Sequence, residues 1–302
     1  MEFWTDSDAF WIILTGSLVA VSCGLLGCYL ILRQMAMIGD AISHAVLPGI
    51  VIAFLVSNSL SSAPALLGAA SVGLLATFLI ETVHRNGRLQ ADASIGLVFT
   101  FLFAVGVIMV AALAKNVDID QECVLYGEIA FVLFDDAVLG MPVSSFILVL
   151  NLIGILLVIS IGYRGLFLTT FDPAYARAIG VTTGVWHYLL MGMVSLTSVV
   201  SFESVGAILV VAFLIGPAAI AHLLTDRMPV MLLLASIAGI GAAVGGYFFA
   251  ASLDASISGA MTTVLGLEFL LAFLFAPQRG LITKRFRKVD APVDVSADAR
   301  LR

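Results

Sequence analysis

Long apolar runs recur from one end of this 302-residue chain to the other, and they restrict its fold more than any other feature. A helix needs about 20 apolar residues to cross a hydrocarbon layer roughly 30 Å thick. Hydrophobic residues make up 61% of the chain and charged residues only 11%. Such usage is far from that of soluble globular domains. The runs therefore predict a polytopic membrane protein whose spans are α-helices.

The runs predict about eight to nine transmembrane helices. We expect them at residues 9–32, 40–58, 62–83, 94–114, 141–162, 183–201, 205–224, 229–250 and 257–276. Too little chain remains for a separate soluble domain, so we expect a single membrane domain over residues 1–282. Residues 283–302 are basic and then polar, which predicts a disordered tail.

The distribution of basic residues predicts the orientation of the chain. Bases fall in loops on one side of the predicted helices, and that side is expected to be cytoplasmic. These bases are Arg33, Arg85, Arg88, Arg164, Arg177, Arg227 and those between Arg279 and Lys288. The opposite loops hold Lys115 and an acidic stretch over residues 116–140. We therefore expect an inner-membrane protein with its N-terminus outside and its C-terminus in the cytoplasm. The acidic N-terminus leads into a run too long for a signal-peptide core, which predicts a retained first helix.

The sequence shows no motif for a thiolate zinc site or for a nucleotide-binding phosphate loop. The three cysteines, Cys23, Cys28 and Cys123, have no CxxC spacing, which argues against a thiolate zinc site. The three lysines follow no glycine-rich phosphate loop of the GK[ST] type. If ATP drives this protein, a separate subunit hydrolyses it. We expect no permanently bound cofactor and no nucleic-acid partner.

The segment over residues 34–49 places polar groups in a predicted span. Asp40 and His44 are four residues apart, so they lie on one helical face, with Ser43 beside them. An ionisable group in a spanning helix is costly and normally faces the bundle interior or a wet pathway. A carboxylate with an imidazole suits manganese, iron or zinc. The plainer alternative is that Asp40 caps the helix and His44 hydrogen-bonds within the bundle.

Residues 171–180 predict a short helix in a loop on the cytoplasmic side. Asp172 is a good N-cap, Pro173 suits the first helical position and Gly180 suits the C-terminal end. A capped helix at that face is a natural docking element. The alternative is a plain connecting turn.

Five further ionisable residues allow more than one interpretation. His222 could be an exit ligand for a metal or a satisfied histidine at the membrane interface. Glu203 and Glu268 could line a path, pair with a neighbour or extend to the interface. His84 is expected in a basic loop, and His187 beside aromatic residues at an interface.

Several of these segments together resemble the permease family of manganese, zinc and iron ATP-binding cassette (ABC) importers, the ABC-3 type. The segment over residues 40–49 resembles the family signature, and the others follow in the expected order. They are residues 92–96, 124–128, 171–180, 205–219 and 258–260, the last before Pro277. The resemblance covers residues 8–282.

The resemblance implies an all-helical, type II ABC importer-like permease. It implies partners as well: cytoplasmic ABC ATPases, an external metal-binding lipoprotein and a second permease, identical or a sister chain. Asp40 and His44 would contact the transported metal briefly. Residues 120–128 are more similar to permeases of manganese or iron systems, which favours these metals as substrates. The helix from Asp172 to Gly180 would be the coupling helix that seats in the ATPase. The resemblance assigns to this coupling helix the residues Asp172, Pro173, Tyr175, Arg177 and Gly180.

Two rival functions are less well matched by the sequence. A proton-coupled secondary metal transporter could use the same Asp40 and His44, but no inverted repeat with broken helices is visible. An intramembrane hydrolase would need a partnered nucleophile, and the adjacent Ser43 and His44 point to different helix faces. We therefore expect a transport protein and no enzyme.

Overall fold

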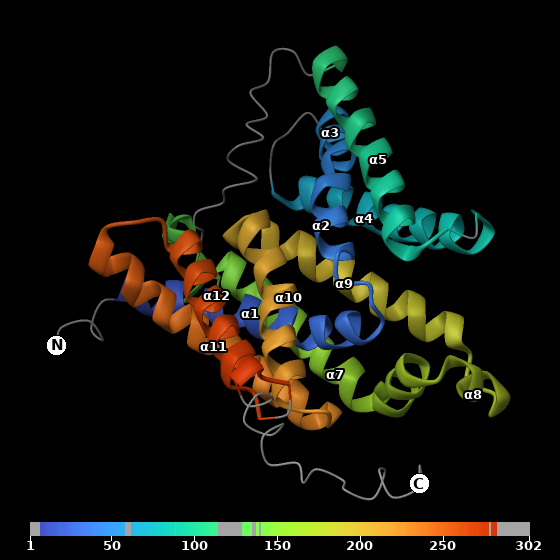
Figure 1. Ribbon diagram of the computed structural model, residues 1–302. Helices are drawn as coiled ribbons and strands as arrows, with labels where there is room; N and C mark the ends of the chain where they lie inside the picture. Colours follow the sequence, from blue (N-terminus) through green and yellow to red (C-terminus); the bar gives the residue numbers. More distant parts are fainter. Residues whose placement is uncertain are drawn as a thin grey trace, which may run out of the picture.

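The computed structural model is almost entirely helical (Figure 1). It describes residues 7–57, 62–87, 89–113, 129–134, 137–138, 140–277 and 279–282. The predicted tail over residues 283–302 and the acidic stretch up to residue 128 lie outside these ranges. Within them, nine helical spans are long and apolar enough to cross a membrane, as the sequence predicts.

The elements follow the apolar runs in chain order. The α-helices are α1 (Ser7–Leu32), α2 (Ile38–Ala45), α3 (Leu47–Ser57), α4 (Ser62–Gly87), α5 (Ala91–Leu113), α7 (Val143–Phe171), α8 (Pro173–Ala178), α9 (Thr183–Val205), α10 (Ala207–Leu224), α11 (Met228–Leu253) and α12 (Ile257–Phe275). A 3-10 helix, η1 (Ile129–Phe134), precedes two short antiparallel strands, β1 (Ala137–Val138) and β2 (Met141–Pro142). Gly140 has a φ of +81°, which the turn between these strands requires.

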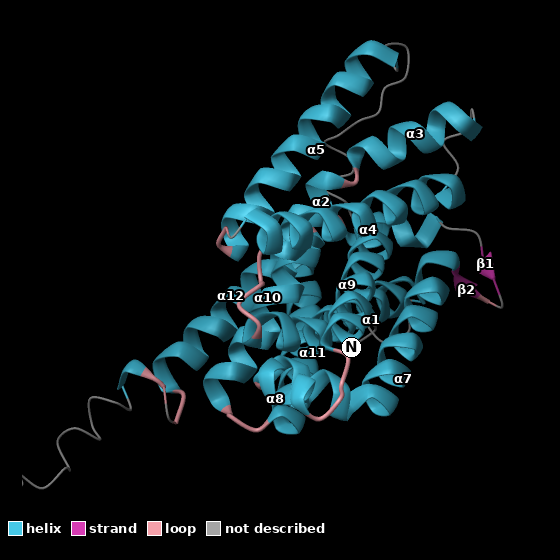
Figure 2. Ribbon diagram, turned by 90° about the vertical axis from the view of Figure 1, so that its right-hand side faces the viewer, coloured by secondary structure: helices cyan, strands magenta, loops and turns pink. Residues whose placement is uncertain are grey.

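Helix α1 is the centre of the bundle. It packs against α7, α9, α10 and α11, and 61% of its apolar stretch is buried, against 22% for α5 and α12. Helices α3 and α5 extend beyond the rest of the bundle (Figures 1 and 2). Several of their apolar side chains are exposed, among them Val56, Phe101 and Ile108, as expected for surfaces that meet lipid or another protein chain.

The second predicted helix is wrong in one respect, because the structure divides it into α2 and α3. Val46 lies between the two segments, in a turn. Pro48 has no backbone N–H, so it cannot continue the hydrogen-bond ladder at this point. The ladder closes locally, since the N–H groups of Gly49 and Ile50 both donate to the Val46 carbonyl. The break leaves α2 as a separate short helix.

Helix α7 is longer than predicted, reaching Phe171 where the sequence suggested an end at residue 162. Leu166 and Thr169, in the added part, are buried against other helices. Tertiary packing thus extends α7 beyond the apolar run that the sequence predicts. The helix ends at Phe171, two residues before Pro173. Because of this extension, α8 begins directly after α7 and lies at one end of the bundle (Figure 1).

Small residues let the central helices approach closely, as the glycine-rich stretches predict. A Cβ atom at Gly27 of α1 would clash with the backbone carbonyl of Leu214 on α10. In the same way, Gly246 of α11 lies against the backbone of Met261 on α12. Helices in lipid associate through such close contacts, since apolar burial gives little drive there.

Replacing Gly27 with Ala is expected to destabilise the protein by about 1–3 kcal/mol, because the added methyl group forces α1 and α10 apart. The unfolding midpoint of the purified protein in detergent measures the effect. Gly266→Ala is the matched control, since a Cβ there meets no other atom within 4 Å. An equal response of both variants would contradict the close approach of α1 and α10.

Candidate functional site

Asp40 and His44 lie on one face of α2, as the spacing predicts. Oδ1 of Asp40 is 3.6 Å from Nε2 of His44, and about a third of each side chain is exposed. The opposite face of α2, which includes Ile38 and Ile42, is buried in the bundle. Amphipathic α2 therefore presents a carboxylate and an imidazole together, within a span apolar enough to cross the membrane.

The surroundings leave this pair available. Met37 is the N-cap of α2 and no side chain caps it, so the capping role considered for Asp40 is wrong. The hydroxyl of Ser43 donates its hydrogen bond to the backbone carbonyl of Asp40 and not to the Asp40 carboxylate. The His44 ring lies edge-on to Phe103 of α5, with ring centres 5.8 Å apart. Phe99 of α5 lies 6.0 Å from the same ring, so two aromatic side chains of α5 pack beside the imidazole.

The described residues offer this site only part of a coordination sphere. Metal bonds to nitrogen and oxygen are about 2.0–2.2 Å long, so one ion can bridge two atoms 3.6 Å apart. Among the described residues, no group of three or more His, Cys, Asp or Glu side chains is placed to hold a metal. Within the described residues, the pair can therefore contact a metal ion only weakly.

The segment after α7 forms the capped helix that the sequence predicts. Oδ1 of Asp172 accepts hydrogen bonds from the N–H groups of Ala174 and Tyr175, at 3.1 and 2.8 Å. Pro173 occupies the first turn of α8. Gly180 has a φ of +86°, a conformation that other residues rarely adopt, and so ends the segment.

Helix α8 exposes most of its side chains. Tyr175 is 54% exposed, and Arg177 is exposed with its Nε bonded to the Pro173 carbonyl. Only Ala176 is buried in this helix. A short, doubly fixed helix that shows a tyrosine and an arginine to solvent has the form of a protein-docking element.

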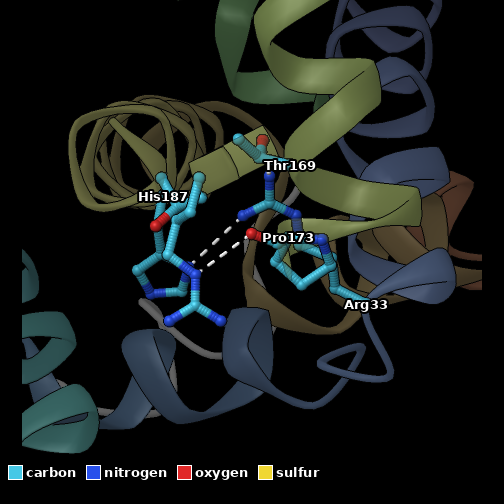
Figure 3. Close-up of a pocket in the computed structure, with 6 residues that line it drawn as sticks. Arg33, Thr169, Pro173 and His187 are labelled. Carbon is cyan, nitrogen blue, oxygen red and sulfur yellow. Dashed lines mark hydrogen bonds between the residues drawn. The ribbon is translucent and has the colours of Figure 1, made fainter. Parts of the chain in front are cut away.

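A polar network behind α8 was not predicted. The Arg33 guanidinium donates to Thr170 and Thr169 at the end of α7, at 3.1 and 3.0 Å. Its Nη1 lies 3.3 Å from Nδ1 of His187 on α9, and the other ring nitrogen of His187 is 3.0 Å from the Glu81 carboxylate on α4. Figure 3 shows Arg33 and His187 beside Thr169 and Pro173. One guanidinium thus joins three helices.

Sequence reasoning treated Arg33 only as a marker of orientation and passed over Glu81. The available signal was an ionisable residue inside a predicted span, which requires a partner. The ring of His187 is in T-shaped contact with Tyr188, with centres 5.7 Å apart, but its part in the polar network was not predicted. Its neighbour Trp186 packs onto Gly162 and Gly165 of α7, and the His187 side chain itself is 15% exposed. Burial lowers the pKa of the Arg33 guanidinium from its ordinary value.

A second cluster fixes the chain after α12. Arg279 forms an ion pair with Asp226 at 2.6 Å and donates to the backbone carbonyl of His222 at 3.1 Å. Its Nη1 also lies 2.6 Å from Nε2 of His222. Because arginine is only a donor, this nitrogen accepts. The geometry supports the satisfied histidine among the two interpretations of His222.

Replacing Asp172 with Ala removes the cap of α8 and is expected to destabilise the helix by about 1 kcal/mol. Faster hydrogen exchange at the Ala174 and Tyr175 amides measures the loss. Asp172→Asn is the control, since an asparagine side chain caps equally well. Unchanged exchange in the alanine variant would show that the cap does not hold α8.

Comparison with known proteins places the whole membrane region in one family. The model of the ABC 3 transport family matches residues 7–276. The manganese transport system membrane protein MntD of Bacillus subtilis is 50% identical over 93% of this chain and 96% of its own length. The zinc transport system membrane protein TroD of Treponema pallidum is 39% identical over 90% of this chain and 75% of its own.

A solved structure agrees with the fold. PsaBC from Streptococcus pneumoniae, in complex with Fab, superposes with a TM-score of 0.77 at 33% identity, over 95% of this chain and 97% of that one. The expected permease architecture and the family resemblance are therefore confirmed. With its nine candidate spans and a family match over residues 7–276, the chain belongs to the ABC 3 transport family.

Proposed function

We propose that this protein is the membrane permease of an ABC importer for divalent transition metals, with manganese as its first candidate substrate. The observation that carries the proposal is the Asp40–His44 pair on α2, in a chain of a transport family. Manganese is favoured because MntD is the more similar of the two relatives described above. Family membership favours ATP as the energy source over a proton gradient.

The metal contact needs a second permease, in this proposal. The described part of one chain offers two donors at the site, and both are partly exposed on the outside of α2. A symmetric or closely related partner brings a second such pair to the same axis. Carboxylate and imidazole ligands suit manganese and zinc alike. Few and weak ligands allow release, whereas a complete set would trap the ion.

Coupling to the ATPase runs through α8, in this proposal. Its exposed Tyr175 and Arg177 contact a cytoplasmic ATPase subunit. The caps at Asp172 and Gly180 keep α8 helical when that subunit moves it. The Arg33 network ties the end of α7, just before α8, to the chain that leads into α2. A movement of α8 thus reaches the metal contact through one guanidinium.

The remaining assignments follow from the positive-inside distribution of Lys and Arg. The side with α8 faces the cytoplasm, and the N-terminus faces outward in a bacterial inner membrane. An external metal-binding lipoprotein delivers the ion to that outer side. The metal is cargo and not a resident cofactor.

Replacing Asp40 or His44 with Ala is expected to reduce metal uptake to the level of cells that lack the gene. Either change removes one of the two proposed metal ligands among the described residues. Uptake of manganese, zinc and iron under chelation is measured together, with membrane insertion verified. His84→Ala is the control for loss of an imidazole outside the site. Normal uptake by the Asp40→Ala protein would rule out the assignment of the metal contact.

Replacing Tyr175 with Ala is expected to weaken ATPase binding by about 30-fold, since a buried aromatic contact at an interface contributes about 2 kcal/mol. Co-purification of the two subunits and metal-stimulated ATP hydrolysis measure the loss. Tyr188→Ala is the matched control, because Tyr188 is similarly exposed but lies on α9. If both variants keep full ATPase binding, α8 is not the docking element.

A further inference from the structure

A cavity of about 640 Å³ lies behind α8. It is lined by Arg33, Thr169, Pro173, Arg177, Thr183 and His187, which come from the end of α1 and from α7, α8 and α9 (Figure 3). Its volume falls in the range of small-molecule sites. The lining joins two guanidinium groups, one imidazole and two hydroxyl groups, and it includes no carboxylate among the described residues.

Within the described part of the chain, neither guanidinium group forms an ion pair with a carboxylate. The Glu81 carboxylate acts on the Arg33 charge from beyond ion-pair distance and contacts His187 directly. The capping oxygen of Asp172 serves backbone N–H groups. Arg33 is half-buried and Arg177 is exposed, and together they place two positive charges at one cavity. Their combined charge favours an anion there.

Both arginines also keep unused donors. A guanidinium carries five N–H groups, and Arg33 uses three in the bonds to Thr169, Thr170 and His187. Arg177 uses its Nε on the Pro173 carbonyl. The remaining N–H groups can donate charge-assisted hydrogen bonds to the oxygen atoms of a phosphate.

We propose that this cavity binds a phosphate group, with Arg33 and Arg177 as its charged contacts and the Thr183 hydroxyl as a further donor. The phosphate belongs either to an anionic phospholipid headgroup or to a free phosphate ion. The cavity lies at helix ends rich in bases, where headgroups of the cytoplasmic leaflet gather. The bound group neutralises the cations behind α8 and holds that helix against α1 and α9. The proposal is independent of the transported metal.

The test uses the full chain in nanodiscs, with two arms that separate the sources. In the first arm, nanodiscs contain phosphatidylcholine with phosphatidylglycerol, and native mass spectrometry counts the phosphatidylglycerol molecules retained per chain. In the second arm, nanodiscs contain phosphatidylcholine alone. Inorganic phosphate is then compared with chloride at equal ionic strength, and the unfolding midpoint is measured.

We expect Arg177→Gln and Arg33→Gln to reduce phosphate-group binding by about tenfold each, the loss typical of one charge-assisted pair. Arg177 is exposed, so its replacement tests the site even if Arg33→Gln fails to fold. Arg227→Gln is the matched control, because it removes the same charge from another loop and is expected to change neither arm.

The arms assign the source of the phosphate. Specific retention of phosphatidylglycerol identifies a headgroup, and a phosphate-dependent rise of the midpoint in phosphatidylcholine alone identifies the free ion. The proposal is overturned if the wild-type chain responds in neither arm. It is equally overturned if Arg227→Gln lowers binding as much as Arg177→Gln does, since the effect would then be general surface charge.

Discussion

The hydrogen-bonding demand of the backbone within lipid is the constraint on which this structure depends. Lipid offers no partner to a peptide N–H or C=O group, so each span must be a helix that satisfies its own groups. Helices satisfied in this way associate by close contact. Gly27 lets α1 touch the backbone of α10, and the other central helices gather around α1.

A local exception to this constraint shapes the proposed metal contact. Pro48 removes one donor from the ladder, and the chain turns at Val46. Helix α2 then packs through Ile38 and Ile42 while Asp40 and His44 stay partly exposed. Val46 keeps a helical backbone, with φ −75° and ψ −15°, so α2 and α3 remain one candidate span with a missing hydrogen bond beside the polar pair.

A polar network lies at the C-terminal end of α1, between the chain that leads into α2 and the end of α7, which precedes α8. Arg33 follows α1 and precedes α2, and it binds both threonines at the end of α7. Polar groups in a low-dielectric setting hold strict geometry, because a lost partner is expensive. The network is therefore suited to transmit a displacement of α8, and the cationic cavity beside it gives that region a place for a counter-ion.

The sequence by itself determined the spans, the shared face of Asp40 and His44, and the caps of α8 at Asp172 and Gly180. These features depend on neighbours within a few residues, through hydrophobic run length, helical period and capping chemistry. Only the tertiary structure decided the extension of α7 to Phe171 and the joining of Arg33, His187 and Glu81. The sequence could not show these two features, because the residues involved are distant along the chain and meet only when the rotation and packing of whole helices are set.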